Sequence, residues 1–423
     1  MTVAIDFRNV DIVFGKKRAR AEDPKVAEAL RMMDAGASRG DVASKTGLIL
    51  GISNASLQVE RGEICVLMGL SGSGKSTLLR AANGLNAVTR GNALVHHRDG
   101  MVDLATCDAA TLRRVRTEAV AMVFQQFALL PWRTVRENVG LGLELRGMRS
   151  SERRRIVDEK LHLVGLEQWA DRYAQELSGG MQQRVGLARA FATDADILLM
   201  DEPFSALDPL IRNKLQDELL ALQAAVHKTI LFVSHDLNEA MKLGNRIAIL
   251  EGGRIIQDGT PEDIALRPAN DYVASFVHHM NPLPVLKGRS VMTPLSALSR
   301  DRDALVFGPA GEFRLVLDQA GRALSASVGG ETRPLLPPAE ASAPARPFDA
   351  FHLARADMAL SDLIEVQQGS RYPVILADGE RIVGVCSVRE ILQALTARPG
   401  AQATAAPVAA GGAEELRAVA HTA

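Results

Sequence analysis

Residues 69–77 read GLSGSGKST, and this stretch decides the fold. The string contains a glycine, four further residues, and then Gly74, Lys75 and Ser76, a pattern that wraps backbone N–H groups around the phosphates of a nucleotide. The apolar run EICVLM before it predicts a buried strand, and STLLRAANGL after it predicts a helix. A strand, a phosphate loop and a helix in this order predict a nucleotide-binding α/β fold.

Two side chains of the loop suit the chemistry of a nucleotide. Lys75 would neutralise the β- and γ-phosphates, and the Ser76 hydroxyl would ligate Mg²⁺. The N-terminus of the following helix would add the positive end of its dipole to the same site. The loop therefore predicts a site for a nucleotide and a magnesium ion.

The apolar run ILLMDE, residues 197–202, ends in two carboxylates. A buried parallel strand delivers its last residues to the ligand crevice at the carboxyl end of the sheet. Asp201 would hold the Mg²⁺ shell, and Glu202 would polarise the attacking water, because hydrolysis of a γ-phosphate depends on positioning the nucleophile. A solvated strand end is the plainer alternative.

Polar residues also follow two other apolar runs. His235 ends TILFVSH, where it could contact both the γ-phosphate and Glu202. Gln125 follows AMVF, so its amide could touch the metal or a water molecule. Both residues are expected at the carboxyl end of the same sheet.

The string LSGGMQQR, residues 177–184, encodes a second anion site. Ser178, Gly179 and Gly180 stand directly before the helical stretch MQQRVGLARAFA, and small residues at a helix N-terminus expose N–H groups to an anion.

Together these motifs resemble the ATP-binding cassette (ABC) ATPases over about residues 3–270. GLSGSGKST matches the Walker A loop, Gln125 the Q-loop, LSGGMQQR the signature, Asp201 with Glu202 the Walker B end, SALD the D-loop and His235 the switch histidine, all in family order. The resemblance implies an α/β P-loop NTPase cassette with a RecA-like core, an N-terminal antiparallel β subdomain and a helical subdomain. It also implies that the chain hydrolyses ATP with Mg²⁺.

Residue by residue, the resemblance implies three overlapping groups. The catalytic residues are Glu202, His235 and Lys75, and the metal ligands are Ser76, Gln125 and Asp201. The nucleotide-binding residues are Phe14, Gly69, Leu70, Ser71, Gly72, Ser73, Gly74, Lys75, Ser76, Thr77, Gln125, Ser178, Gly179, Gly180, Gln182, Asp201 and Asp208. Phe14 stands at the place of the adenine-stacking aromatic, although a core phenylalanine would explain it as well.

In this family the signature closes over ATP that is bound to a second cassette. The chain has one set of motifs, so the resemblance implies two ATP molecules held between two copies. The signature residues and Asp208 would then act across the dimer.

Two departures from a minimal cassette narrow the subfamily. The first is an insert over residues 16–50, in which Asp23 would cap a helix starting at Pro24, while Ser38 and Gly47 bracket a second short turn of helix. With DEPFSALDPLIR and PANDYVASFV, this insert resembles the ATPase subunits of quaternary-amine importers for glycine betaine, proline betaine and choline. The string FVHHMNPLPVL favours the choline branch.

The second departure is the C-terminal region, which is expected to be α+β. Residues 361–395, SDLIEVQQGSRYPVILADGERIVGVCSVREILQAL, read helix, strand, a turn at Asp378-Gly379, strand and helix, and are similar to a CBS motif, a regulatory module. Ser387 and Glu390 depart from the ribose-binding version of that motif, so a regulatory fold is expected rather than a ligand site. The expected layout begins with a cassette at 1–270, which includes a helical subdomain at about 127–190. A connector follows at 271–335, with a degenerate first copy of the motif at 301–330. The rest is a Pro/Ala-rich linker at 336–348, the CBS-like motif at 349–396 and a disordered tail at 397–423.

Composition limits the partners. The chain has 423 residues, a formal net charge of −1 and three cysteines, so neither nucleic-acid binding nor a disulfide framework is expected. No apolar run approaches the roughly 18 residues of a membrane helix, and the N-terminus lacks the features of a signal peptide. The chain is therefore not expected to span a membrane. The resemblance to importer ATPases then implies a peripheral protein on the cytoplasmic face of the inner membrane, with separate integral membrane permease subunits that act with a substrate-binding protein.

The segment FALLPWRTVRENVGLGLELRGM, residues 127–148, is the expected dock for the permease, because Leu129, Leu130 and Trp132 are too apolar for a free loop. Packing within its own helical subdomain is the alternative. For the whole chain, the competing functions are another transport ATPase, including an exporter, and a soluble ABC ATPase of translation or DNA repair.

Overall fold

The computed structural model describes residues 2–15, 23–98, 100–278, 283, 285–337 and 347–396. The chain divides into two compact units, Met1–Ile264 and Ala265–Ala423. Most of the expected linker at 336–348 and the expected tail at 397–423 lie outside the described residues, as do parts of the insert and of the string FVHHMNPLPVL.

The first unit is built around a six-stranded sheet with the strand order β10-β9-β3-β8-β7-β6. Its central strands β3 (Ile64–Met68), β8 (Thr229–Val233) and β7 (Ile197–Asp201) are buried along their whole length, as continuous apolar runs require. The outer strands are β6 (Val120–Val123), β9 (Arg246–Glu251) and β10 (Arg254–Gly259). All neighbours pair in parallel except β9 with β10, so the strands that carry the motifs end at one edge of the sheet.

A four-stranded antiparallel sheet with the order β2-β1-β4-β5 packs against this core. Its strands are β1 (Val3–Phe14), β2 (Ile49–Glu60), β4 (Arg90–His97) and β5 (Gly100–Asp103). One hydrophobic cluster contains Ile5 of β1 and Leu67 of β3, so the two sheets share a core.

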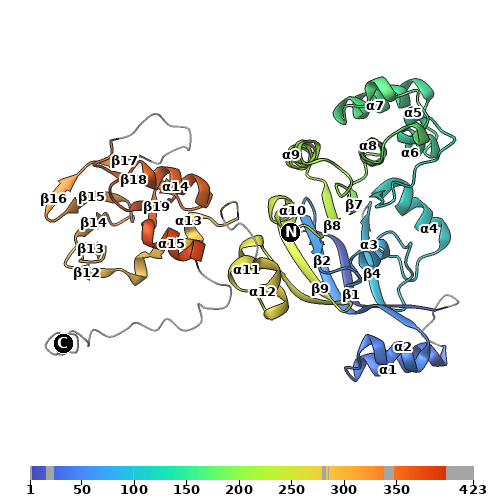
Figure 1. The fold of residues 1–423 in the computed structure, drawn as a ribbon, viewed down its shortest axis with the longest axis horizontal. Helices are drawn as coiled ribbons and strands as arrows, with labels where there is room; N and C mark the ends of the chain where they lie inside the picture. The colour runs from blue at the N-terminus through green and yellow to red at the C-terminus, as the bar shows by residue number, and fades with distance from the viewer. Residues whose placement is uncertain are drawn as a thin grey trace, which may run out of the picture. The chain divides into compact units, whose positions relative to one another are not determined.

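The insert forms the two helices that the sequence predicts, α1 (Pro24–Asp34) and α2 (Arg39–Thr46). The Asp23 carboxylate accepts a hydrogen bond from the backbone of Lys25 at the start of α1, and Ser38 forms a capping box with Asp41. Gly47 ends α2 in the left-handed conformation, at φ 69°. Figure 1 shows these helices at one end of the first unit, on the opposite side from α5, α6 and α7.

The remaining helices of this unit surround the sheets or form the helical subdomain. The first group consists of α3 (Lys75–Ala81), α4 (Ala109–Arg114), α9 (Pro209–Val226) and α10 (Leu237–Leu243). The second consists of α5 (Val135–Val139), α6 (Leu141–Leu145), α7 (Ser150–Leu163) and α8 (Gly179–Ala192). Helix α11 (Pro261–Leu266) crosses the boundary between the two units.

The second unit begins with α12 (Asp271–Val277) and α13 (Gly288–Val291) and contains two five-stranded sheets. The first sheet has the order β12-β13-β14-β15-β16, in which every neighbouring pair is antiparallel. Its strands are β12 (Ser299–Asp301), β13 (Ala304–Phe307), β14 (Phe313–Leu317), β15 (Ala323–Val328) and β16 (Glu331–Arg333). The structure differs here from the expectation of a degenerate first motif at 301–330, because these residues form hairpins and lack the helices that such a copy needs.

The second sheet has the order β11-β20-β19-β18-β17 and, with two helices, contains the segment 361–395 that is expected to resemble a CBS motif. Its elements are β11 (Thr293–Pro294), β17 (Leu335–Leu336), β18 (Phe351–Arg355), α14 (Leu360–Gln368), β19 (Val374–Asp378), β20 (Arg381–Cys386) and α15 (Val388–Thr396). The predicted succession of helix, strand, turn, strand and helix is confirmed, and Gly379 occupies the turn at φ 60°.

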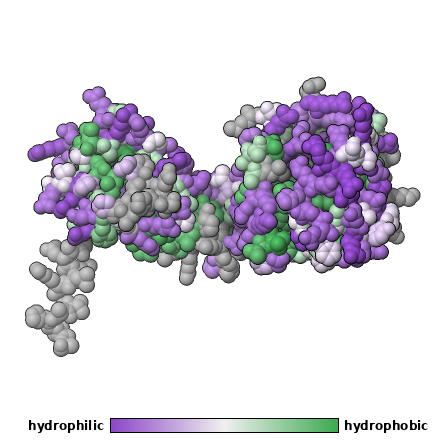
Figure 2. All heavy atoms as spheres, turned by 90° about the horizontal axis from the view of Figure 1, so that it is seen from above, coloured by the Kyte–Doolittle hydropathy of each residue, from purple (hydrophilic) through white to green (hydrophobic). Residues whose placement is uncertain are grey.

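Both units present largely hydrophilic surfaces with scattered apolar patches in Figure 2. Within the described residues, no helix has the length and apolar character needed to cross a membrane.

Candidate functional site

The phosphate loop joins β3 to α3 in a conformation that requires glycine. Gly69 has φ 144° and Gly74 has φ 106°, values that side chains with a Cβ rarely adopt. A Cβ on Gly74 would stand 2.8 Å from the carbonyl oxygen of Gly51, and one on Gly69 would collide with the carbonyl oxygen of Leu250. The Ser73 hydroxyl is buried and makes no hydrogen bond in the described structure. The loop is thus a close-fitting cradle with an unsatisfied donor, as a phosphate site needs.

Lys75 bends back over this cradle. Its ammonium Nζ donates to the carbonyl oxygens of Gly69 at 2.8 Å and Leu70 at 3.0 Å, and the residue is only 7% exposed. Burial lowers the pKa of the Lys75 ammonium, while the negative charges of Glu202 and Asp201 act in the opposite direction. The lysine is therefore a desolvated cation placed at the loop.

The structure brings Ser76 of the loop together with Asp201 at the end of β7. The Ser76 Oγ donates to the Asp201 Oδ1 at 2.7 Å, and the Arg80 Nη2 donates to the other carboxylate oxygen at 2.9 Å. Asp201 is fully buried, so this pairing compensates for the removal of its charge from water. The sequence motifs did not reveal the contribution of Arg80.

Glu202 lies at the centre of a second polar group. Its Oε2 accepts a hydrogen bond from Gln125 Nε2 at 3.3 Å and lies 3.2 Å from His235 Nδ1. Glu202 also adopts φ 49°, a left-handed conformation that is uncommon outside glycine and that often occurs at functional sites. The three residues predicted to meet at the carboxyl edge of the sheet therefore do meet.

Phe14 ends β1 and is 38% exposed, so it is not the core phenylalanine of the alternative interpretation. A Cβ placed on Gly51 would lie 2.6 Å from the Phe14 ring and 3.1 Å from Cγ2 of Thr77 in the loop. The aromatic ring is therefore an exposed surface close to the start of α3, where a base could stack on it.

The signature residues occupy the N-terminus of α8, as predicted. Ser178 caps the helix by accepting from the backbone N–H of Met181 at 3.4 Å, and Gln182 Nε2 donates to the carbonyl oxygen of Leu177 at 3.0 Å. Ser178 and Gly179 are exposed and Gly180 is partly exposed. These small residues remain open to another molecule.

Gln183 is a buried residue whose contacts the motif alone did not reveal. Its amide Nε2 donates to the carbonyl oxygen of Glu202 at 3.2 Å, and its Oε1 accepts from the backbone N–H of Ala206 at 3.1 Å. Asp208 ends the loop between β7 and α9. It caps α9 by accepting from the backbone N–H of Ile211 at 3.1 Å, and it is exposed. Gln183 thus joins the signature helix to the backbone that carries Glu202.

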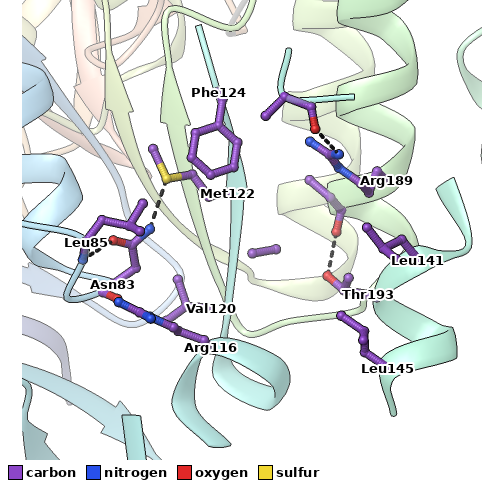
Figure 3. Close-up of a pocket in the computed structure, with 14 residues that line it drawn as sticks. Asn83, Leu85, Arg116, Val120, Met122, Phe124, Leu141, Leu145, Arg189 and Thr193 are labelled. Carbon is purple, nitrogen blue, oxygen red and sulfur yellow. Dashed lines mark hydrogen bonds between the residues drawn. The ribbon is translucent and has the colours of Figure 1, made fainter. Parts of the chain in front are cut away.

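A separate cavity of about 330 Å³ lies between the core and the helical subdomain (Figure 3). Leu85, Val120, Met122 and Phe124 line it from the core, and Leu141, Leu145 and Thr193 line it from the facing helices. Leu145 is 70% exposed, and so is Trp132 in the preceding segment. Part of the apolar segment at 127–148 therefore faces solvent instead of packing within its own subdomain.

Comparison with known proteins gives a consistent set of relatives. Residues 52–205 match the model of the family described as "ABC transporter". The chain is 47% identical over 321 residues to the glycine betaine/proline betaine transport system ATP-binding protein ProV of Escherichia coli (strain K12), covering 75% of this chain and 76% of ProV. It is 45% identical over 300 residues to the glycine betaine transport ATP-binding protein OpuAA of Bacillus subtilis (strain 168), covering 71% and 69% of the two chains.

A third relative and a solved structure extend the comparison. The trimethylamine N-oxide transport system ATP-binding protein TmoW of Ruegeria pomeroyi is 46% identical over 284 residues, covering 67% of this chain and 79% of TmoW. The dimeric structure of MJ0796, a bacterial ABC transporter cassette, superposes with a TM-score of 0.51 at 31% identity. It covers 61% of this chain and 98% of MJ0796, and the same cassette has also been solved as a dimer bound to ADP and Pi.

Proposed function

The chain belongs to the ABC transporter family as an ATP-binding subunit, and from this premise we propose that it powers the import of a quaternary ammonium compound. Glycine betaine and proline betaine are the first candidates, because the names of ProV and OpuAA specify them. Choline is the alternative substrate. The observation that carries the proposal is the arrangement of Glu202, His235 and Gln125 beside the Ser76–Asp201 pair, on a chain that is 47% identical to ProV.

The residues present suit a magnesium nucleotide. Mg²⁺ prefers oxygen ligands and is held by one or two carboxylates together with phosphates and water. Ser76 Oγ and Asp201 Oδ1 lie 2.7 Å apart, close to the roughly 2.9 Å between neighbouring ligands in an octahedral shell. Ser76 and Asp201 would hold the metal, with Gln125 as a further ligand. When bound, the metal neutralises charge on the phosphate oxygens.

The protein's own groups then divide the work of hydrolysis. Lys75 already lies over the cradle and would exchange its two carbonyl partners for phosphate oxygens. Glu202 orients a water molecule and accepts its proton, while His235 and Gln125 hold the Glu202 carboxylate in place. Phe14 offers its exposed ring to the adenine.

We further propose that two copies share the ATP sites. Ser178 and Gly179 are exposed at the N-terminus of α8, where they could cover a nucleotide bound to a second copy. Asp208 is also exposed, at the N-terminus of α9, and would act across the same interface. The dimeric form of the MJ0796 cassette supports this assembly.

The permease would dock at the cavity beneath α6. Its lining is largely apolar, and Leu145 and Trp132 leave further apolar surface exposed, which a membrane subunit could cover. Such a partner would hold the chain at the cytoplasmic face of the inner membrane and connect it to a substrate-binding protein.

The second unit would regulate transport as a CBS-like fold. Glu390 accepts hydrogen bonds from Thr293 and Ser387, which favours a structural role over ligand binding for that carboxylate.

Transport by the assembled complex in proteoliposomes tests the proposal. With the nucleotide-binding subunit and ATP inside the vesicles, we expect uptake of radiolabelled glycine betaine, and Lys75→Ala should abolish it. Parallel measurements with choline and proline betaine would rank the substrates. Accumulation of none of the three, by a complex that hydrolyses ATP normally, would favour another transport substrate or an exporter.

A further inference from the structure

One side chain of the helical insert reaches the phosphate loop. Arg39 is the first residue of α2, and its Nη1 donates to the carbonyl oxygen of Gly72 at 2.7 Å. Its Nη2 donates to the carbonyl oxygen of Gly51 in β2 at 2.5 Å. The guanidinium thus connects α2, the start of β2 and the phosphate loop.

The surroundings of Arg39 are shaped to receive it. Gly253, in the turn between β9 and β10, has φ 83°, and a Cβ there would collide with Arg39 Nη2 and crowd the Gly51 carbonyl. The same Gly253 donates its backbone N–H to the carbonyl oxygen of Ser73 at 2.9 Å. Burial lowers the pKa of the Arg39 guanidinium, which still remains charged.

These contacts hold two successive carbonyl groups of the phosphate loop. Arg39 binds the Gly72 oxygen and Gly253 binds the Ser73 oxygen. In a trans peptide the C=O and the following N–H point in opposite directions. The N–H groups of Ser73 and Gly74 are therefore directed away from Arg39 and Gly253. The Ser73 N–H donates across the loop to the carbonyl oxygen of Leu70 at 3.1 Å.

The insert is fixed independently of Arg39, so Arg39 is not needed as its anchor. Arg90 of β4 donates to both carboxylate oxygens of Asp34, at 2.8 and 2.6 Å, and to Asp11 at 2.6 Å. An apolar cluster joins the insert to β1 and β2, and its buried members are Val13, Val26, Ala29, Leu30, Met33, Val42 and Leu50. The cluster and the Arg90 pairs place α2 firmly enough for Arg39 to act on the loop.

We propose that Arg39 is a positioning residue of the nucleotide site, which holds the Gly72 carbonyl outward so that the loop presents its N–H groups to the phosphates. The insert is then part of the ATP site and contributes to affinity for the nucleotide. This inference rests on the proposed function, because it requires that the loop bind ATP.

Kinetics of the full chain in its assembled complex test this role. Arg39→Ala should raise KM for ATP roughly tenfold, the factor expected from losing a charge-assisted hydrogen bond, and change kcat by less than about threefold. Arg39→Lys keeps a charged donor and should recover part of the affinity. Arg31→Ala is the matched control, because Arg31 lies on α1 in an exposed ion pair with Glu28 and should leave KM unchanged.

Thermal unfolding of the same variants separates positioning from anchoring. We expect Arg39→Ala to unfold within a few degrees of the wild type, since the apolar cluster and the Arg90 pairs remain. An unchanged KM in Arg39→Ala, whether or not its unfolding temperature falls, would overturn the proposal. A failure of the proposed function would give a different result. In that case the wild-type complex would show no ATP hydrolysis that depends on Lys75.

Discussion

Glu202→Gln separates ATP binding from ATP hydrolysis. The change removes the carboxylate charge but keeps nearly the same shape, and the amide oxygen can still accept a hydrogen bond from Gln125. The backbone at position 202 has φ 49° in the wild type, and glutamine in that conformation adds no strain that glutamate lacks. The Mg²⁺ ligands Ser76 and Asp201 are untouched.

Glu202→Gln is expected to affect the rate of ATP hydrolysis far more than the stability of the fold. Loss of a positioned general base costs about 10²- to 10⁴-fold in turnover, or roughly 3–5 kcal/mol of barrier. The Glu202–His235 pair contributes little to folding, because the histidine side chain is 64% exposed and exposed pairs supply about 0–1 kcal/mol. We therefore expect a folded variant that binds MgATP within about threefold of the wild-type affinity and hydrolyses it at least about a hundredfold more slowly.

Phosphate release by the assembled complex measures turnover, and sedimentation of the isolated chain with ATP measures whether the closed dimer accumulates. Glu28→Gln is the matched control, since it makes the same chemical change on the exposed surface of α1. Turnover of Glu202→Gln within threefold of the wild type would refute the assigned role. Loss of ATP binding would show instead that Glu202 belongs to the binding site.

Three further predictions concern other parts of the chain. Phe14→Ala should raise KM for ATP by roughly fivefold or more while Phe14→Tyr keeps it near the wild-type value, because a base loses about 1–3 kcal/mol of stacking; equal KM values would remove Phe14 from the site. Leu145→Arg should prevent co-purification with the membrane subunits yet leave ATP binding by the chain intact, and normal co-purification would place the dock elsewhere. Burial raises the pKa of the Glu239 carboxyl above its ordinary value of 4.5, so folded chains hold that proton more tightly and stability falls as the pH rises from 4.5 through the folded pKa. Relative to the wild type, Glu239→Gln should gain unfolding temperature across that pH window, and a pH-independent difference would contradict this assignment.

The sequence predicted the features that depend on local pattern. The apolar runs that become β3, β7 and β8 are long enough and uniform enough to indicate buried parallel strands. Likewise, Asp23 and Ser38 marked the starts of α1 and α2, because a side-chain cap is recognisable from neighbouring residues alone.

Contacts between distant residues were not predictable in the same way. Arg80 meets Asp201 across 121 positions, and Arg39 meets Gly72 across 33. Arginine is common on exposed helix faces, so nothing local distinguishes these two from solvated residues.

The error at 301–330 had an available signal. Glycines separate the short apolar runs there, and Gly311, Gly321 and Gly329 all take positive φ in the turns. Short runs divided by such turns predict hairpins, whereas a CBS-like copy requires amphipathic helices.

Mixing two defective forms of the chain tests the shared ATP site most directly. Consider a complex with one Lys75→Ala subunit and one Ser178→Arg subunit. If each ATP site joins the phosphate loop of one copy to the signature of the other, both defects fall in the same site. The second site then has an intact phosphate loop and an intact signature. The shared site predicts that this mixed complex regains measurable ATP hydrolysis, while complexes with two identical defective subunits remain inactive. If the mixed complex is as inactive as both of them, each chain uses its own signature and the shared site is wrong.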